Sequence, residues 1–146
     1  MKKHAAVKLI SILAIFTAWG ISPITYGQEK GKQEGAPKEI TFTVKRLVVG
    51  MGVENSEPVS VAETFPASTE RVYCFLEAAD IAKDTEVSFV WSYGDKEMLK
   101  TILPLKAGPK WRTYANKNLR GLKGDWKVEI KDSEGKVLKD VKFKVE

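Results

Sequence analysis

Side chains that alternate between apolar and charged are the feature that most constrains how this chain can fold. In residues 126–131 Trp, Val and Ile alternate with Lys and Glu, and residues 141–145 repeat the pattern with Val and Phe against Lys. A period of two places one set of side chains on a buried face and the other in water, as in a β-strand. The sequence Asp-Ser-Glu-Gly at 132–135 supplies a turn between the two segments. Together these residues predict a β-hairpin.

The rest of the chain after residue 38 shows similar short apolar runs with turn residues between them. We expect strands near residues 40–45, 72–78, 87–93, 98–105 and 111–115. Residues 72–78 are apolar on both faces, which places that strand in the centre of a sheet. About seven short strands, with almost no helical periodicity, predict an all-β fold. The fold class that we expect is an immunoglobulin-like antiparallel β-sandwich of about seven strands.

Residues 1–27 are typical of a secretory signal peptide. Residues 1–8 carry three lysines and no acid, and residues 9–21 are almost wholly apolar. Thr25 and Gly27 then place small residues three and one positions before a cut at Gln28. The alternative is a membrane anchor, but this apolar run is shorter than the roughly 20 residues that a spanning helix needs. We therefore expect cleavage, no transmembrane segment in the remaining chain, and a periplasmic or secreted protein.

The chain that follows the signal peptide divides into a linker and one domain. Residues 28–38 are polar, contain Gly and lack an apolar run, so they predict a flexible linker. Residues 39–146 hold all the expected strands and form the predicted β-sandwich domain. A domain of this length can bury a core of its own.

Positive charge is concentrated in residues 106–127. The whole chain carries 24 basic and 19 acidic residues, but in this segment the basic residues stand against Asp125 alone. They are Lys106, Lys110, Arg112, Lys117, Arg120, Lys123 and Lys127. Trp111, Tyr114 and Trp126 lie among them. The guanidinium of Arg112, beside an indole and a phenol in the sequence, is of a type that can stack on aromatic rings and bind planar anions.

The basic and aromatic segment holds the candidate ligand-binding residues. They are Lys110, Trp111, Arg112 and Lys117. In an exported protein the ligand would be an anionic glycan or lipid of the cell envelope rather than nucleic acid. The alternative is that the tryptophans pack in the core and the lysines coat the surface. Trp126 is in phase with Val128, and Trp91 with Phe89, which favours the core for both tryptophans.

Residue types that carry catalysis are scarce. The single His, His4, lies in the expected signal peptide, so the mature chain has no imidazole for a general base or a His-based triad. One Cys cannot rebuild a four-ligand metal site. The nearest carboxylate pairs are Asp80 with Asp84 and Asp132 with Glu134, all in turn-like segments. We expect no enzyme activity, no metal site and no cofactor.

Cys74 lies on the apolar strand at 72–78, on one face with Val72 and Leu76. There a thiol packs as a small hydrophobic group, which favours burial. The alternative is an intermolecular disulfide, because an unpaired Cys is unusual in an oxidising compartment.

Six short motifs occur once each along the domain, in a characteristic order. They are RVYCF at 71–75, VWSYG at 90–94, LPL at 103–105, WRT at 111–113, GDWKV at 124–128 and GKVL at 135–138. In this order and spacing, residues 65–146 resemble domain-of-unknown-function family 2914. The resemblance implies a small β-rich bacterial domain that is exported alone or attached to larger membrane proteins, with no established activity. The chain departs from the family at Phe89, where His is common, and at Tyr114 and Ala115, where Trp-Ser is common.

Two classes of function remain. The fold, the linker and the scarcity of catalytic groups favour an exported, non-catalytic module that mediates protein–protein interaction in the bacterial cell envelope. Its partner would be an envelope protein. The alternative is a module that binds anionic envelope glycan or lipid through residues 106–127.

Overall fold

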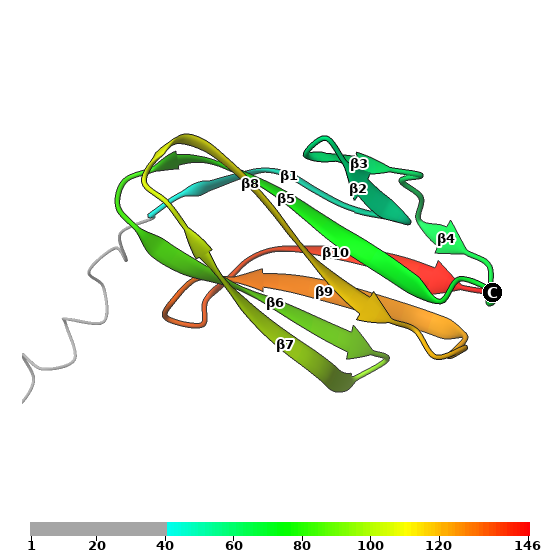
Figure 1. Ribbon diagram of the computed structural model, residues 1–146. Helices are drawn as coiled ribbons and strands as arrows, with labels where there is room; N and C mark the ends of the chain where they lie inside the picture. Colours follow the sequence, from blue (N-terminus) through cyan, green and yellow to red (C-terminus); the bar gives the residue numbers. More distant parts are fainter. Residues whose placement is uncertain (1–40) are drawn as a thin grey trace, which may run out of the picture. The chain divides into compact units, whose positions relative to one another are not determined.

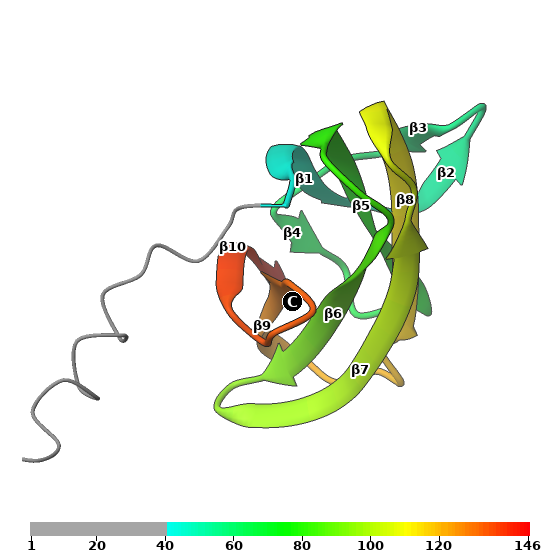
Figure 2. The same ribbon diagram turned by 90° about the vertical axis from the view of Figure 1, so that its left-hand side faces the viewer.

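A computed structural model describes residues 41–146 of the chain. The expected signal peptide (1–27), the expected linker (28–38) and residues 39–40 lie outside the described residues. Ten strands make up the described part, and two main sheets pack face to face (Figures 1 and 2). No helix long and apolar enough to cross a membrane occurs in residues 41–146.

The strands agree with the alternation pattern. In chain order they are β1 (Thr43–Gly50), β2 (Gly52–Glu54), β3 (Glu57–Val59), β4 (Thr64–Phe65), β5 (Arg71–Ile81), β6 (Thr85–Tyr93), β7 (Lys96–Leu105), β8 (Gly108–Asn118), β9 (Gly124–Lys131) and β10 (Val137–Val145). Seven of them, β1 and β5 to β10, have eight or more residues. The expected number is thereby confirmed, with the short strands β2, β3 and β4 as additions. β1 begins and ends later than the strand expected at 40–45.

The strands form an immunoglobulin-like β-sandwich, as predicted. One sheet has the order β1-β5-β8, the other the order β4-β10-β9-β6-β7, and β2 and β3 form a separate hairpin. All pairings are antiparallel except that of β4 with β10. β5 lies between β1 and β8, which confirms the central position predicted for residues 72–78. The predicted hairpin of β9 and β10 is also confirmed.

The core lies between the two main sheets and is built from the alternating apolar positions. Trp126 stacks on Phe143, with ring centroids 6.0 Å apart and planes at 8°, and Trp91 meets Phe143 edge-on at 6.4 Å. The Trp126 indole N–H donates to the carbonyl oxygen of Leu122 at 3.2 Å. Both tryptophans are at most 1% exposed, so their predicted core positions are confirmed. Cys74 is fully buried in the same core, which confirms the burial that its strand pattern favours.

Two turns show why their residues favour a hairpin. Asn55 and Ser56 have φ of +50° and +59°, as a two-residue type I′ turn between β2 and β3 requires. The β9–β10 turn is held by the carboxylate of Asp132, whose Oδ1 accepts hydrogen bonds from the amides of Glu134 and Lys136 at 3.0 and 2.9 Å. Asp132 is therefore occupied in shaping a turn.

The hairpin of β2 and β3 contacts β5 and β1 on the side away from the core (Figure 2). Its base is tight, because the amide of Met51 donates to the carbonyl oxygen of Val59 at 3.0 Å. A Cβ atom at Gly50 would lie 2.5 Å from that same oxygen. Glycine at position 50 therefore lets the chain double back at the end of β1.

The segment around β4 clasps the end of β10. The amide of Lys144 donates to the Glu63 carbonyl at 2.8 Å, and the amide of Glu146 donates to the Phe65 carbonyl at 3.0 Å. The amide of Ala67 donates in turn to the main-chain carbonyl oxygen of Glu146 at 2.6 Å. Residues 63–67 and 144–146 thus close one edge of the five-stranded sheet.

Candidate functional site

All four predicted ligand-binding residues lie on β8. Strand alternation points Lys110 and Arg112 away from the core, and Trp111 and Lys117 towards the side that faces the second sheet. Lys110, Trp111 and Arg112 border an open hollow of about 400 Å³ together with Ser56, which belongs to the β2–β3 turn. Lys117 is not among the residues that line this hollow.

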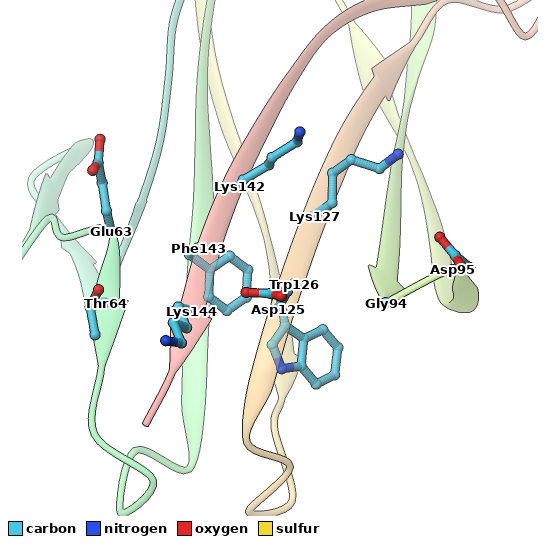
Figure 3. A pocket seen from close by; sticks show the side chains of 10 residues that line it. All are labelled: Glu63, Thr64, Gly94, Asp95, Asp125, Trp126, Lys127, Lys142, Phe143 and Lys144. Carbon is cyan, nitrogen blue, oxygen red and sulfur yellow. The ribbon is translucent and has the colours of Figure 1, made fainter.

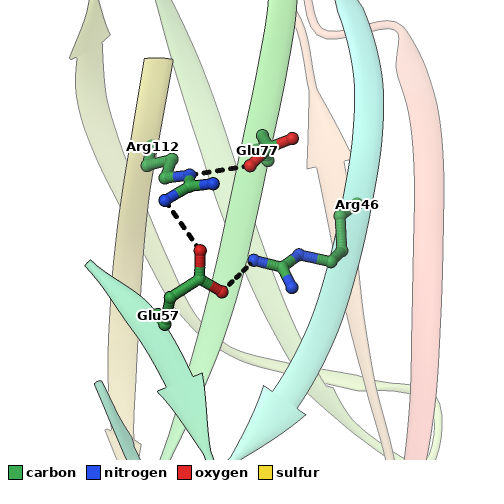
Figure 4. A network of polar contacts seen from close by, with 4 residues as sticks. All are labelled: Arg46, Glu57, Glu77 and Arg112. Carbon is green, nitrogen blue, oxygen red and sulfur yellow. Dashed lines mark hydrogen bonds and ion pairs between the residues drawn. The ribbon is translucent and has the colours of Figure 1, made fainter. Parts of the chain in front are cut away.

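The guanidinium of Arg112 is held by two carboxylates (Figure 4). Its Nη1 lies 2.7 Å from Glu57 Oε1, and its Nε donates to Glu77 Oε2 at 2.7 Å. Glu57 Oε2 also accepts a hydrogen bond from Arg46 Nη2 at 2.5 Å. The Arg46 hydrogen bond, followed by the charges of Arg112, Arg46 and Lys110, holds the pKa of Glu57 below its usual value. This network of Arg46, Glu57, Arg112 and Glu77 ties the β2–β3 hairpin to the three-stranded sheet.

The side chains of Trp111 and Lys117 lie on the inner side of β8, which faces the second sheet. The indole of Trp111 is half-buried and packs against the core. Lys117 Nζ lies 5.9 Å from the centroid of the Trp126 ring and donates to the carbonyl oxygen of Asn118 at 2.8 Å. Burial, and then the charge of Arg120, lower the pKa of Lys117. Lys117 therefore lies on the opposite side of the sheet from Arg112.

Arg112 does not stack on an aromatic ring of residues 41–146. Adjacent residues of a strand point to opposite faces, so Arg112 and Trp111 cannot stack on each other. In residues 41–146, the cation–aromatic contacts are Arg46 with Phe75, at 4.9 Å, and Lys117 with Trp126. Glu57, the partner that occupies Arg112, could not be identified from the sequence, because it lies on a short hairpin far away along the chain.

A larger hollow of about 590 Å³ lies against the five-stranded sheet, and sequence reasoning missed it (Figure 3). Its charged lining residues are Lys127, Lys142, Lys144, Glu63, Asp95 and Asp125. Three cations and three acids leave it without a strong field of one sign. Lys127 is also paired with Glu129 at 2.9 Å, and this hydrogen bond raises the pKa of Lys127. The hollow is assembled from four separate segments, so no local motif indicated it.

Strand β7 forms the free edge of the five-stranded sheet. It is ten residues long and pairs only with β6 in the described structure. Leu99 is 38% exposed and Ile102 is 52% exposed, although both are large apolar residues. A free edge carries unpaired backbone N–H and C=O groups that another strand can bind. β7 is thus a free edge on which two large apolar side chains are exposed between charged ones.

The structure does not activate two residues that could take part in catalysis, Cys74 and Asp84. Burial raises the pKa of the Cys74 thiol, which disfavours the reactive thiolate. The hydrogen bond from the Ala107 amide, followed by Lys106, lowers the pKa of Asp84, the opposite of what a general acid needs. Within residues 41–146, no three His, Cys, Asp or Glu side chains lie close enough to hold a metal ion.

Comparison with known proteins supports the family resemblance. Residues 84–145, from just before β6 to the end of β10, match the family described as "Protein of unknown function (DUF2914)". The resemblance inferred from the motifs is confirmed over this range. No curated protein matches the chain.

Several solved structures are similar to this chain at low sequence identity. An immunoglobulin-like protein from Pseudomonas aeruginosa has 16% identity and a TM-score of 0.49, over 77% of this chain and 100% of that one. A β-glucosidase from Listeria innocua in complex with glucose has 11% identity and a TM-score of 0.46 over 73% of this chain. The match spans only 16% of the glucosidase.

Proposed function

We propose that this chain is an exported, non-catalytic β-sandwich module that mediates protein–protein interaction in the bacterial cell envelope. The observation that carries the proposal is the free edge of β7, with Leu99 and Ile102 exposed. The signal-peptide pattern of residues 1–27 supports export.

Strand β7 suits the addition of a partner strand. Main-chain hydrogen bonds along such an edge supply affinity, and the alternate side chains supply specificity. Leu99 lies opposite Trp91 in the register and Ile102 lies opposite Ser88, so one points to the core side of the sheet and the other to its outer side. Pro104 lacks an N–H and interrupts pairing at one end. The segment from Leu99 to Leu103 is thus the part that a partner strand would pair with.

The geometry gives less support to an anionic ligand on Lys110, Trp111, Arg112 and Lys117. Arg112 already has two carboxylate partners, Glu57 and Glu77, which an anion would have to displace. Lys110 and Lys117 lie on opposite sides of the sheet. Binding of an anion at these residues remains a prediction from the sequence.

Site-specific photo-crosslinking in living cells tests the proposed interface. A photoreactive amino acid at Ile102 should form an adduct with one specific envelope protein. The same amino acid at Val137, which is 46% exposed on β10, is the matched control and should not. Leu99→Asp should abolish the adduct at position 102, because it places a charge on the apolar edge. No adduct, or the same adducts from both positions, would contradict the proposal.

Export is tested separately by cell fractionation and N-terminal sequencing of the purified chain. We expect the protein in the periplasm or the medium, with Gln28 as its first residue. A chain that stays in the cytoplasm with residues 1–27 attached would exclude an envelope role.

A further inference from the structure

Two free strand edges lie on the same side of the sandwich (Figure 2). In the described structure β7 pairs only with β6 and β8 only with β5, and residues 106–107 connect β7 to β8. The core-facing side chains along these edges are only partly buried: Leu99 is 38% exposed, and Leu103 and Trp111 are half-buried. On the neighbouring strand β6, Trp91 is completely buried. The core is therefore incompletely covered where β7 and β8 end their sheets.

Residues 99–103 are the part of β7 that can accept another strand. Before them the register with β6 shifts at Met98, which forms a β-bulge. After them Pro104 has no N–H to donate to a partner. Within the segment Leu99, Thr101 and Leu103 face the core side, because they lie opposite inward-pointing residues of β6. A strand that pairs here must therefore carry apolar side chains at alternate positions to cover this side of the core.

Lys100 places a positive charge on the outer side of the same segment. It lies opposite Val90 on β6, and the outward residues on either side of Val90 are serines. Beyond Val90 in the same row, Glu129 on β9 is paired with Lys127 at 2.9 Å. Glu97 is the next outward residue of β7 and makes no ion pair with Lys100. Within residues 41–146, Lys100 therefore has no acidic partner.

The two edges together are basic. Strands β7 and β8 carry five basic residues and Glu97 as their single acid. The basic residues are Lys96, Lys100, Lys110, Arg112 and Lys117. Arg112 is neutralised by Glu57 and Glu77 (Figure 4), which leaves four lysines against one glutamate. Negative charge on an occupant of this side of the sandwich therefore favours its binding.

We propose that the strand that pairs with β7 is acidic, an extended segment of another protein in which apolar residues alternate with Asp or Glu. This inference rests on the protein–protein interaction proposed above and names the chemistry of the partner. The apolar side chains cover Leu99 and Leu103 and extend the core towards Trp111. The acidic side chains lie on the outer side, where one of them pairs with Lys100. Opposite-charge pairs across neighbouring strands stabilise a sheet, and like-charge pairs destabilise it.

The position of Lys100 disfavours a second copy of this chain as the occupant. If two copies of β7 paired antiparallel over residues 99–103, Thr101 would lie opposite its own counterpart. Lys100 would then be diagonal to Lys100 of the second copy, within reach of its charge. A lysine on an exposed edge strand blocks such self-pairing, and it leaves the edge open to a strand with the opposite charge. Residues 28–38 of this chain do not fit either, because they lack alternating apolar residues.

NMR titration of the ¹⁵N-labelled chain with two capped heptapeptides tests the chemistry of the partner. One peptide alternates valine with glutamate, and the other alternates valine with lysine. We expect the glutamate peptide to shift the amide signals of residues 99–103 and to bind at least about fivefold more tightly than the lysine peptide. The preference should shrink at high salt, because the charges are exposed. A glutamate peptide with proline in place of its central valine should not bind, because proline interrupts the strand.

A charge reversal in the chain supplies the matched control. Lys100→Glu should remove the preference for the glutamate peptide. Lys142→Glu reverses an exposed lysine of β10, away from the free edge, and should leave the preference within about twofold of the native chain. Amide spectra of both variants check the fold, and sedimentation should show the native chain as a monomer.

The proposal is overturned by the absence of shifts with the glutamate peptide, or by equal binding of the glutamate and lysine peptides. It also fails if Lys100→Glu keeps the native preference. A native dimer that Ile102→Asp dissociates would make a second copy the occupant instead. A specific adduct at Ile102 in cells, found together with any of these results, would leave the protein-interaction proposal in place and remove only the acidic strand. The failures of the two proposals are therefore distinguishable.

Discussion

The buried thiol of Cys74 allows a sharp test of the sandwich through its reaction with a thiol reagent such as dithionitrobenzoate. Cys74 is 0% exposed on the central strand β5, opposite Val49 on β1 and Ala115 on β8. Strands on both sides and a second sheet above leave no route for the reagent. We therefore expect Cys74 to react only after the three-stranded sheet opens.

The expected protection follows from the stability of an ordinary domain. Domains of this size have a free energy of unfolding of about 5–15 kcal/mol, and even the lower figure leaves only a few chains in ten thousand unfolded at equilibrium. If opening requires global unfolding, the native thiol reacts roughly several thousand times more slowly than the unfolded chain. The logarithm of the rate should rise linearly with urea, with the slope of the global unfolding transition.

An internal control makes the measurement decisive. Val137→Cys adds an exposed thiol to the same molecule, since Val137 is 46% exposed. The variant should show one fast and one slow phase of equal amplitude. A native Cys74 that reacts within about tenfold of the fast phase, or a disulfide-linked dimer under native conditions, would refute the burial described above.

Three other changes have expected outcomes. Gly50→Ala should destabilise the domain by about 1–3 kcal/mol in thermal unfolding, because its Cβ would lie 2.5 Å from the Val59 carbonyl oxygen. Gly52→Ala meets only a methyl carbon of Val59, at 3.1 Å, and should lose less; equal losses would contradict the tight turn. Trp126→Ala should cost about 3–5 kcal/mol in urea unfolding, since the indole is 1% exposed, and a loss below about 1 kcal/mol would contradict its core position. Burial raises the pKa of Cys74 in the folded chain above its value in the unfolded chain. The free energy of unfolding should therefore keep its full value below the ordinary thiol pKa of about 8.5 and fall as the pH rises above it. Cys74→Ala should lack this pH dependence.

The alternation of side chains was sufficient to predict the main strands. Trp126 and Trp91 were placed in the core because each is in phase with apolar neighbours on its own strand. Cys74 was placed there for the same reason. A period of two is a local property, set by the geometry of the extended backbone, and a single sequence therefore carries it.

The β2–β3 hairpin and its contacts could not be predicted in the same way. Its strands have three residues each, too short for an alternation to be visible. Its turn uses Asn55 and Ser56 instead of the Asn-Gly pair that signals a hairpin. Without the hairpin, nothing in the sequence indicated that Glu57 would neutralise Arg112. The inward position of Lys117, in contrast, could have been predicted from the sequence, because Lys117 is in phase with the buried Ala115.

The clasp between β4 and β10 also governs when the fold can be completed. Phe65 on β4 pairs with Val145 on β10, so β4 cannot join its sheet until residues eighty positions later in the chain are present. A chain that emerges from a ribosome or threads through a membrane pore from its N-terminus can form the β6–β7 hairpin on the way. Its five-stranded sheet stays open at one edge until residues 144–146 arrive. During that interval Phe65 and the other apolar side chains of this edge lack the partners that bury them in the folded domain.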